Sequence, residues 1–161
     1  MLNFLEQLAA EWYEYSGYFV RTNVRTRKRA KGGWDIELDV LAYQPSEKFL
    51  VHIETSGDAD SWKERKARFL TKKFILSKSE YEEILGADLE GIQKIAIVGW
   101  SKSPKADLEW GSDVEVMTVP IFLEQIIKKL QGQSFMSESV PEGYPILRTV
   151  QMLLEYGIPA A

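Results

Sequence analysis

The sequence has no cysteine and only one histidine, His52. The lack of cysteine excludes disulfide bonds, thiolate metal sites and thiol nucleophiles, and it fits a reducing compartment. No apolar run approaches the roughly 20 residues that a membrane-spanning helix needs. The first ten residues also lack the basic stretch and apolar run of a signal peptide. We therefore expect a soluble, cytoplasmic protein with no membrane partner.

Acidic residues are scarce in two segments, although the net charge of the chain is −4. Residues 21–31 contain no acid and residues 61–73 contain one, yet together they hold 12 of the 20 lysines and arginines. Two basic patches on an acidic body are typical of a surface that binds one polyanion, here nucleic acid, and repels others. Charge alone leaves open that both patches are ordinary solvated faces. The residues that we assign to nucleic-acid binding are Arg21, Arg25, Arg27, Lys28, Arg29, Lys31, Arg65 and Arg68, with Trp34 and Trp62 as candidates for base stacking.

Composition and periodicity predict one α/β domain that covers residues 1–161. The chain is 45% hydrophobic and 27% charged, and it is long enough to bury a core. The expected order is a helix, three strands, a helix, two strands and two helices, which indicates a mixed sheet with helices packed against it. We expect helices over 2–15, from Ser61 through the second basic segment, over a short stretch ending near Gly86, and over 120–129 and 145–156. We expect strands over 18–24, 34–43, 49–55, 92–100 and 113–119, with the second and third forming a hairpin.

The hairpin carries the strongest chemical pattern, because Asp39 and Glu54 each alternate with apolar residues along their strands. If the polar faces of the two strands lie on the same side of the sheet, the two carboxylates converge. Carboxylate sites suit Mg²⁺ or Mn²⁺, which activate water for attack on a phosphodiester. The pattern alone also describes the solvated face of an ordinary hairpin. His52, two residues before Glu54, is either a proton shuttle or phosphate contact, or a hydrogen-bonded structural residue.

Three short motifs resemble those of known nucleases. Phe4-Leu5-Glu6 with Gly17-Tyr18 resembles the opening of Mrr-type restriction endonucleases, and residues 37–42 (ELDVLA) resemble the motif of Holliday-junction resolvases. Residues 51–56 (VHIETS) lie where those families carry Glu-x-Lys. Over residues 4–75 the chain thus resembles the PD-(D/E)XK nuclease superfamily. The resemblance implies a restriction endonuclease-like mixed central sheet flanked by helices. It also implies a Mg²⁺- or Mn²⁺-dependent DNA endonuclease, with branched or foreign DNA as candidate substrates and RNA left open.

The resemblance also implies site residues. Asp39 and Glu54 correspond to metal ligands, and the carbonyl group of Thr55 would face the same ion. Glu6 corresponds to the helix acid that orients metal or water, with Glu11 as its alternative. Glu37 would be an acid just outside the metal ligands.

The chain departs from the family pattern at Ser56, which stands where the family has a catalytic lysine. Because serine carries no charge, we expect either that Lys63 or Lys66 from the next helix takes over this work, or that the chain is a non-catalytic DNA-binding module on the same fold. A structural subunit whose basic patches meet an acidic protein is a third possibility. The apolar side of residues 146–154 is a candidate homodimer face, and core packing explains it equally well.

Overall fold

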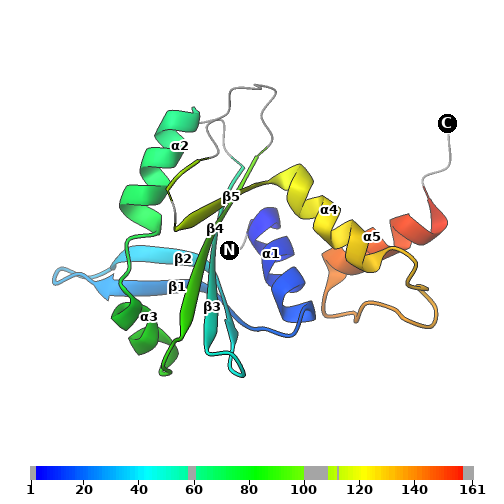
Figure 1. Ribbon diagram of the computed structural model, residues 1–161, viewed down its shortest axis with the longest axis horizontal. Helices are drawn as coiled ribbons and strands as arrows, with labels where there is room; N and C mark the ends of the chain where they lie inside the picture. The colour runs from blue at the N-terminus through cyan, green and yellow to red at the C-terminus, as the bar shows by residue number, and fades with distance from the viewer. Residues whose placement is uncertain (1–2, 58–60, 100–108, 112, 158–161) are drawn as a thin grey trace.

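The computed structural model describes residues 3–57, 61–99, 109–111 and 113–157. A five-stranded mixed sheet of order β1-β2-β3-β4-β5 forms its centre (Figure 1). The strands are β1 (Phe19–Lys28), β2 (Trp34–Gln44), β3 (Phe49–Ser56), β4 (Gly91–Val98) and β5 (Val114–Thr118). The first three strands pair antiparallel as two hairpins, whereas β3, β4 and β5 are parallel. The expected mixed α/β class is therefore confirmed.

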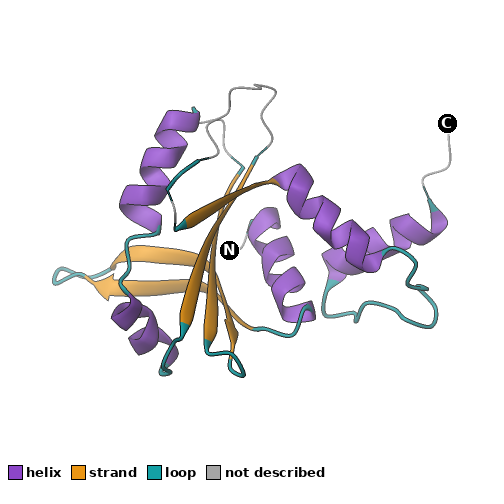
Figure 2. Ribbon diagram, viewed as in Figure 1, coloured by secondary structure: helices purple, strands orange, loops and turns teal. Residues whose placement is uncertain are grey.

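Helices cover both faces of this sheet (Figures 1 and 2). They are α1 (Phe4–Tyr15), α2 (Trp62–Arg68), the π-helix η1 (Phe69–Lys73), α3 (Lys78–Leu85), α4 (Val119–Leu130) and α5 (Pro145–Tyr156). Helices α1, α4 and α5 pack on one face, while α2, η1 and α3 lie on the other. Within the described ranges, no helix has the length and apolar character required to cross a bilayer.

The local signals that predicted the helix starts are present in the structure. The side chain of Ser61 accepts a hydrogen bond from the backbone N–H of Glu64, whose carboxylate reaches back to the N–H of Ser61. This capping box satisfies backbone donors that the first turn of α2 would otherwise leave unpaired. Pro120 lies in the first turn of α4, where its missing N–H costs nothing. Gly86 ends α3 in the left-handed conformation with a φ of 66°.

The apolar residues of β2 divide between the two faces of the sheet, contrary to the single apolar face that alternation predicts. Val40 and Ala42 pack in the core beneath α1, whereas Ile36 and Leu38 pack in the cluster that contains Tyr81 of α3. The β1–β2 pairing skips Asp39, opposite a residue of β1 with a φ of 52°. Asp39 therefore lies where the regular pairing of β2 is interrupted.

The structure extends the first expected strand and shows which residues of α5 are packed. Most of the basic segment 21–31 is strand, because β1 continues to Lys28 and forms the outer part of a long hairpin with β2. In α5, Leu147 is buried in the core while Leu153 and Leu154 are exposed, so the apolar side of this helix is only partly used in packing. The expected helical residue Leu2, the loop residues 58–60 and the strand residue Trp100 lie outside the described residues.

Candidate active site

The β2–β3 hairpin brings Asp39 and Glu54 together at the point where its ladder ends. The last paired residues are Val40 and Ile53, so Asp39 and Glu54 are the next residues outward on the two strands. The backbone N–H of Asp39 donates to Glu54 Oε1 at 3.3 Å, so a carboxylate takes the place of a ladder carbonyl. Glu54 is 0% exposed and Asp39 is 8% exposed. These acids are not the solvated face of a hairpin, which was the alternative that the sequence left open.

One lysine, Lys73, bridges the two carboxylates. Its Nζ lies 3.1 Å from Asp39 Oδ1 and 2.7 Å from Glu54 Oε2, and it donates to the backbone carbonyl of Glu37 at 3.2 Å. Burial acts to lower the pKa of Lys73, but Glu54 and Asp39 outweigh it and raise the pKa above 10.5. The site therefore holds a permanent positive charge between two acids.

Lys73 is neither Lys63 nor Lys66, so the expectation that one of those two lysines reaches the carboxylates is corrected. Lys63 is exposed on α2, and Lys66 Nζ donates to the backbone carbonyl of Glu109 at 2.6 Å. The chain passes from α2 into a π-helix, closed by a hydrogen bond of 2.9 Å from Phe74 N to the carbonyl of Phe69. The wider π turn rotates the residues after Phe69 away from the positions that a helical wheel assigns to them. That rotation carries Lys73 to the carboxylates.

Burial, the charge of Glu54 and the contacts with Lys73 and Thr55 determine the pKa of Asp39. Asp39 Oδ2 accepts from the backbone N–H of Thr55 at 2.9 Å and from its hydroxyl at 3.3 Å. Burial and the charge of Glu54 raise the pKa of Asp39 to about 6, although Lys73 and the Thr55 N–H act in the opposite direction. A carboxyl group with this pKa is partly protonated near neutral pH and is ready to exchange its proton for a cation.

A hydrogen bond from His52, which is itself hydrogen-bonded to Tyr81, orients the carboxylate of Glu54. His52 Nε2 lies 2.8 Å from Glu54 Oε1, and His52 Nδ1 lies 2.7 Å from the hydroxyl of Tyr81. Burial acts to raise the pKa of Glu54, but the hydrogen bond from His52 and the neighbouring ammonium of Lys73 outweigh burial and lower the pKa below 4.5. Both nitrogens of the single histidine are therefore hydrogen-bonded, as its structural interpretation requires.

Arg68 supplies a positive charge at Ser56. Its guanidinium donates to the hydroxyl of Ser56 at 2.9 Å, and Ser56 is almost completely buried. The site thus has two cations, Lys73 at the carboxylates and Arg68 at Ser56. Both come from the continuous α2–η1 segment, so the second basic segment contributes directly to the site.

The remaining acids of the motif have other partners. Glu6 closes a capping box with Asn3 at the start of α1. This turn lines a surface pocket of about 460 Å³ together with Thr55, Ser56 and Gly57. Glu11 is buried, and its Oε2 accepts the backbone N–H groups of residues 146 and 147 at 2.9 and 3.0 Å. Glu11 therefore caps α5 and is not the alternative acid of the site.

Three arginines of the β1–β2 hairpin pair with acids. Arg25 lies 2.8 Å from Glu37, which faces it across the ladder, so the carboxylate of Glu37 is directed at Arg25. The other pairs are Arg27 with Glu80 at 2.8 Å and Arg29 with Asp35, and the guanidinium of Arg21 donates to the carbonyl of Ile84 at 2.8 Å. Lys28 and Lys31 are exposed near the tip of the hairpin. The hairpin therefore offers a nucleic acid less net charge than the sequence suggests.

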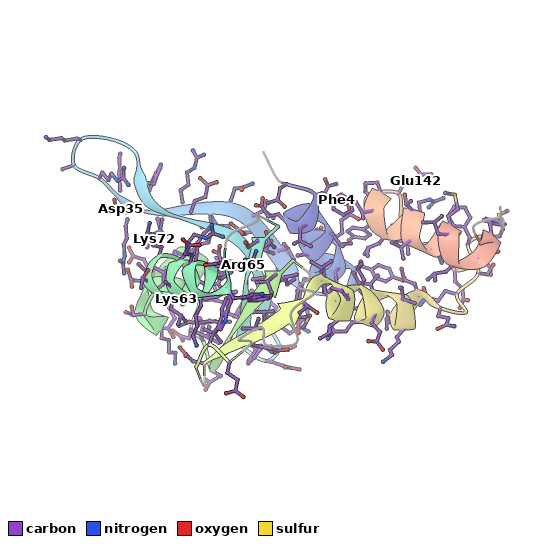
Figure 3. All side chains as sticks on the ribbon, turned by 90° about the horizontal axis from the view of Figure 1, so that it is seen from above. Phe4, Asp35, Lys63, Arg65, Lys72 and Glu142 are labelled. Carbon is purple, nitrogen blue, oxygen red and sulfur yellow. The ribbon has the colours of Figure 1, made fainter. Side chains whose placement is uncertain are left out.

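The α2–η1 segment presents a second set of basic residues. In Figure 3, Lys63 and Lys72 lie along this segment, while Asp35 lies on the hairpin that extends away from the rest of the chain. Arg65 is only 5% exposed, and its guanidinium lies 5.0 Å from the ring centroid of Trp62. The expectation that Arg65 contacts phosphate is corrected, because its charge is buried against an aromatic ring.

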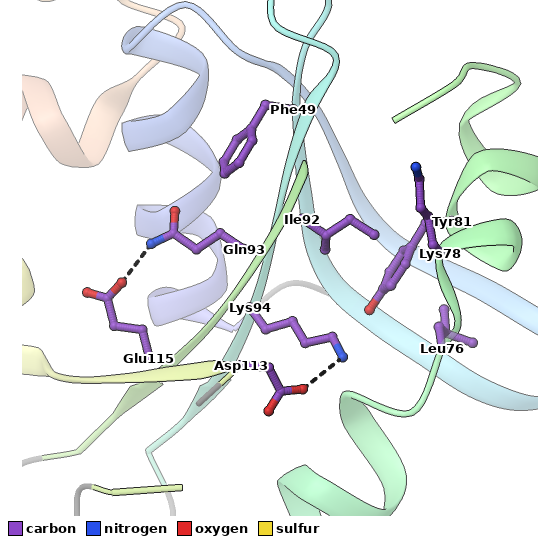
Figure 4. A pocket seen from close by; sticks show the side chains of 9 residues that line it. All are labelled: Phe49, Leu76, Lys78, Tyr81, Ile92, Gln93, Lys94, Asp113 and Glu115. Carbon is purple, nitrogen blue, oxygen red and sulfur yellow. Dashed lines mark hydrogen bonds and ion pairs between the residues drawn. The ribbon is translucent and has the colours of Figure 1, made fainter. Parts of the chain in front are cut away.

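A pocket of about 440 Å³ adjoins the hydrogen-bonded residues His52 and Tyr81 on the same face of the sheet (Figure 4). Tyr81 and Lys94 both line the pocket. Lys94 Nζ donates to the carbonyl of Phe74 at 3.2 Å, directly after the π-helix, and lies 3.5 Å from Asp113. Lys94 therefore supports the end of the segment that delivers Lys73.

The carboxylates of Asp39 and Glu54 fit a single hard cation. Asp39 Oδ1 and Glu54 Oε2 approach one ammonium within 3.1 Å, so both oxygens face the same point. Mg²⁺ is commonly bound by one or two carboxylates and keeps several water ligands. Among the described residues, no group of three or more His, Cys, Asp or Glu side chains is arranged for a metal. A cation at this site would thus rely on two carboxylates and water.

Comparison with known proteins does not add a name to this site. No family model matches the chain, and no curated protein is similar to it in sequence. A solved structure described as a protein of unknown function, AF1548, aligns over 94% of this chain and 95% of its own. The two sequences are 15% identical over the alignment, and the TM-score is 0.45. This level of similarity assigns neither a family nor an activity.

Proposed function

We propose that this chain is a divalent-metal-dependent nuclease that hydrolyses phosphodiester bonds in DNA. The observation that carries the proposal is the approach of one ammonium, that of Lys73, to both Asp39 Oδ1 and Glu54 Oε2. The PD-(D/E)XK resemblance implies two acids on neighbouring strands with a lysine beside them. We therefore propose membership of that superfamily as well, with the lysine supplied by η1 in place of the strand position at Ser56.

The residues have complementary tasks in this proposal. Asp39 and Glu54 would hold the cation, which lowers the pKa of bound water and neutralises charge that develops on the phosphate. Lys73 places an ammonium beside the carboxylates, where it can hydrogen-bond the attacking water or a phosphate oxygen. Arg68, held at Ser56, adds a guanidinium suited to phosphate oxygens. Lys28 and Lys31, which are exposed near the tip of the β1–β2 hairpin, would contact the DNA backbone.

The surroundings of the two acids also explain why their pKa values are shifted in opposite directions. Glu54 is buried and held ionised by hydrogen bonds, so it is the fixed ligand. Asp39, with a pKa raised to about 6, is the ligand whose charge changes on binding. Because both oxygens face the ammonium of Lys73, a divalent cation at that point would take over the neutralisation of their charge that Lys73 now supplies.

The proposal is tested by incubating the full chain with supercoiled plasmid in Mg²⁺, Mn²⁺ or EDTA. We expect nicked and linear products with metal and none with EDTA, and no products from Asp39→Asn or Lys73→Met prepared in parallel. Lys72→Met is the matched control, because Lys72 is the exposed neighbour of Lys73 in the same π-helix. Equal cleavage by Asp39→Asn would reveal a contaminating enzyme. DNA binding without cleavage would favour the non-catalytic module.

A further inference from the structure

We infer that Tyr81 and His52 form a positioning pair that fixes the carboxylate of Glu54 in its cation-binding orientation. The inference rests on the proposed function for its consequence, metal affinity, but its geometry stands on hydrogen bonds alone. The chain of contacts runs from the Tyr81 hydroxyl to His52 Nδ1 at 2.7 Å and from His52 Nε2 to Glu54 Oε1 at 2.8 Å. All three residues are 0% exposed.

The direction of the hydrogen bonds follows from what each group can donate. Glu54 is paired with the ammonium of Lys73, so its carboxylate is ionised and only accepts. His52 must then carry its hydrogen on Nε2, and in a neutral imidazole Nδ1 is left as the acceptor. The hydroxyl of Tyr81 is the donor that satisfies it. Tyr81 thus selects the tautomer in which His52 donates to Glu54.

This arrangement leaves Glu54 with two oxygens in different roles. Oε1 is occupied by His52 and by the backbone N–H of Asp39, while Oε2 faces Lys73. Without His52, the carboxylate would lose the contact that sets its rotation about χ3, a torsion that is otherwise broad. Outer hydrogen bonds of this kind orient metal ligands, and their loss typically costs about 10- to 100-fold in metal affinity.

Packing holds the pair and the lysine in one unit. The ring of His52 meets that of Phe74 edge to face, at 4.9 Å between centroids and 75° between planes. Phe74 follows Lys73 directly, so the same ring that orients Glu54 also supports the residue next to its cation. Tyr81 packs against His52 in turn, with 5.6 Å between centroids.

The first test needs no metal and uses the fact that His52 is the only histidine. A ¹⁵N-detected NMR spectrum of the imidazole ring, recorded on the metal-free full chain, should show one neutral ring with hydrogen on Nε2. In Glu54→Ala, Nε2 loses its acceptor, so the two nitrogen shifts should move toward each other as both tautomers become populated. Hydrogen on Nδ1 in the wild type, in a neutral or a cationic ring, would overturn the inference.

The second test measures Mn²⁺ affinity by calorimetry in Tyr81→Phe, which keeps the ring and removes the hydroxyl. We expect about a tenfold weaker affinity. Tyr15→Phe is the matched control, because it removes a hydroxyl bonded to Gln133 at 3.2 Å on the opposite face of the sheet, and its affinity should equal that of the wild type. Equal Mn²⁺ affinity in Tyr81→Phe and wild type would contradict the positioning role.

A conservative rescue separates positioning from a general effect on folding. The amide nitrogen of glutamine stands as many bonds from Cα as His52 Nε2, so His52→Gln can still donate to Glu54. We expect His52→Gln to retain most of the Mn²⁺ affinity that His52→Leu loses, and equal losses in both would overturn the inference. If the wild-type chain binds no Mn²⁺, the proposed function fails, while the tautomer measurement still decides whether the positioning pair exists.

Discussion

Removal of the ammonium of Lys73 is the most informative single change, because it leaves two carboxylates facing each other in a buried site. Lys73→Met keeps the length of the side chain and removes its charge. The ammonium lies 3.1 Å from Asp39 and 2.7 Å from Glu54. Loss of one partner from a buried ion pair costs about 3–5 kcal/mol. Since the side chain of Lys73 is 28% exposed, solvent screening reduces the expected loss of unfolding free energy to about 2–4 kcal/mol at pH 8.

The loss of unfolding free energy in Lys73→Met should become smaller as the pH falls. Without Lys73, the pKa of Asp39 rises further above its value of about 6, because the cation that opposes the rise is gone. At pH 5 Asp39 is therefore protonated and neutral, so it no longer repels Glu54. The difference in unfolding free energy between wild type and Lys73→Met should then be smaller at pH 5 than at pH 8.

Metal provides the converse measurement. Mn²⁺ at 100 times its Kd adds about 2.7 kcal/mol to the unfolding free energy of a protein that binds it only when folded. In Lys73→Met the cation meets two unpaired acids, whereas in the wild type it must replace an ammonium. Mn²⁺ should thus stabilise Lys73→Met more than wild type.

Urea unfolding followed by tryptophan fluorescence measures these differences, with Lys72→Met as the control for loss of a surface lysine. Lys72→Met should change the unfolding free energy by less than about 0.5 kcal/mol. A Lys73→Met variant as stable as Lys72→Met at pH 8 would show that the ammonium of Lys73 does not stabilise the two carboxylates. Equal stabilisation of both variants by Mn²⁺ would lead to the same conclusion.

Three further predictions follow from the other contacts. Asp39 has a pKa of about 6 in the folded chain against an ordinary value of 3.8, so wild type should lose about 3 kcal/mol of unfolding free energy as the pH rises from well below 3.8 to well above 6. Urea titrations of Asp39→Asn should lack this loss, and a matching loss there would contradict the assignment. Glu11→Ala should lower the unfolding free energy by about 1–3 kcal/mol, since two backbone N–H groups of α5 lose their acceptor; a thermal melt like that of wild type would exclude this cap. The triple variant Arg25→Ala, Arg27→Ala, Arg29→Ala should flatten the slope of log K against log salt for duplex DNA by at most about 2–3 units, and an unchanged slope would remove the hairpin from the DNA-binding surface.

The elements with a strong local signal could be predicted from the sequence. The capping box at Ser61, the proline in the first turn of α4 and the alternation along β2 and β3 all depend on neighbours within a few residues. Alternation also singled out Asp39 and Glu54, because two acids that oppose each other across a hairpin need only its register to meet.

The cations of the site could not be predicted in the same way. Lys73 reaches the acids because η1 adds a π turn, and a 3.6-residue period cannot anticipate that turn. Tyr81 lies 29 residues from His52, so only the packing of α3 on the sheet brings their polar atoms together. The pairing of Arg27 with Glu80, 53 residues apart, is equally nonlocal, and it is why the charge of the first basic segment was overestimated.

Calorimetric titration with Mn²⁺ shows whether Asp39 and Glu54 form one site for a divalent cation. The titration should be made at pH 8, where Asp39 is ionised, on the wild type, Glu54→Gln and Lys72→Met. We predict one Mn²⁺ per chain in the wild type and in Lys72→Met, and no measurable binding in Glu54→Gln. The same stoichiometry and affinity in wild type and Glu54→Gln would show that Glu54 does not bind the cation.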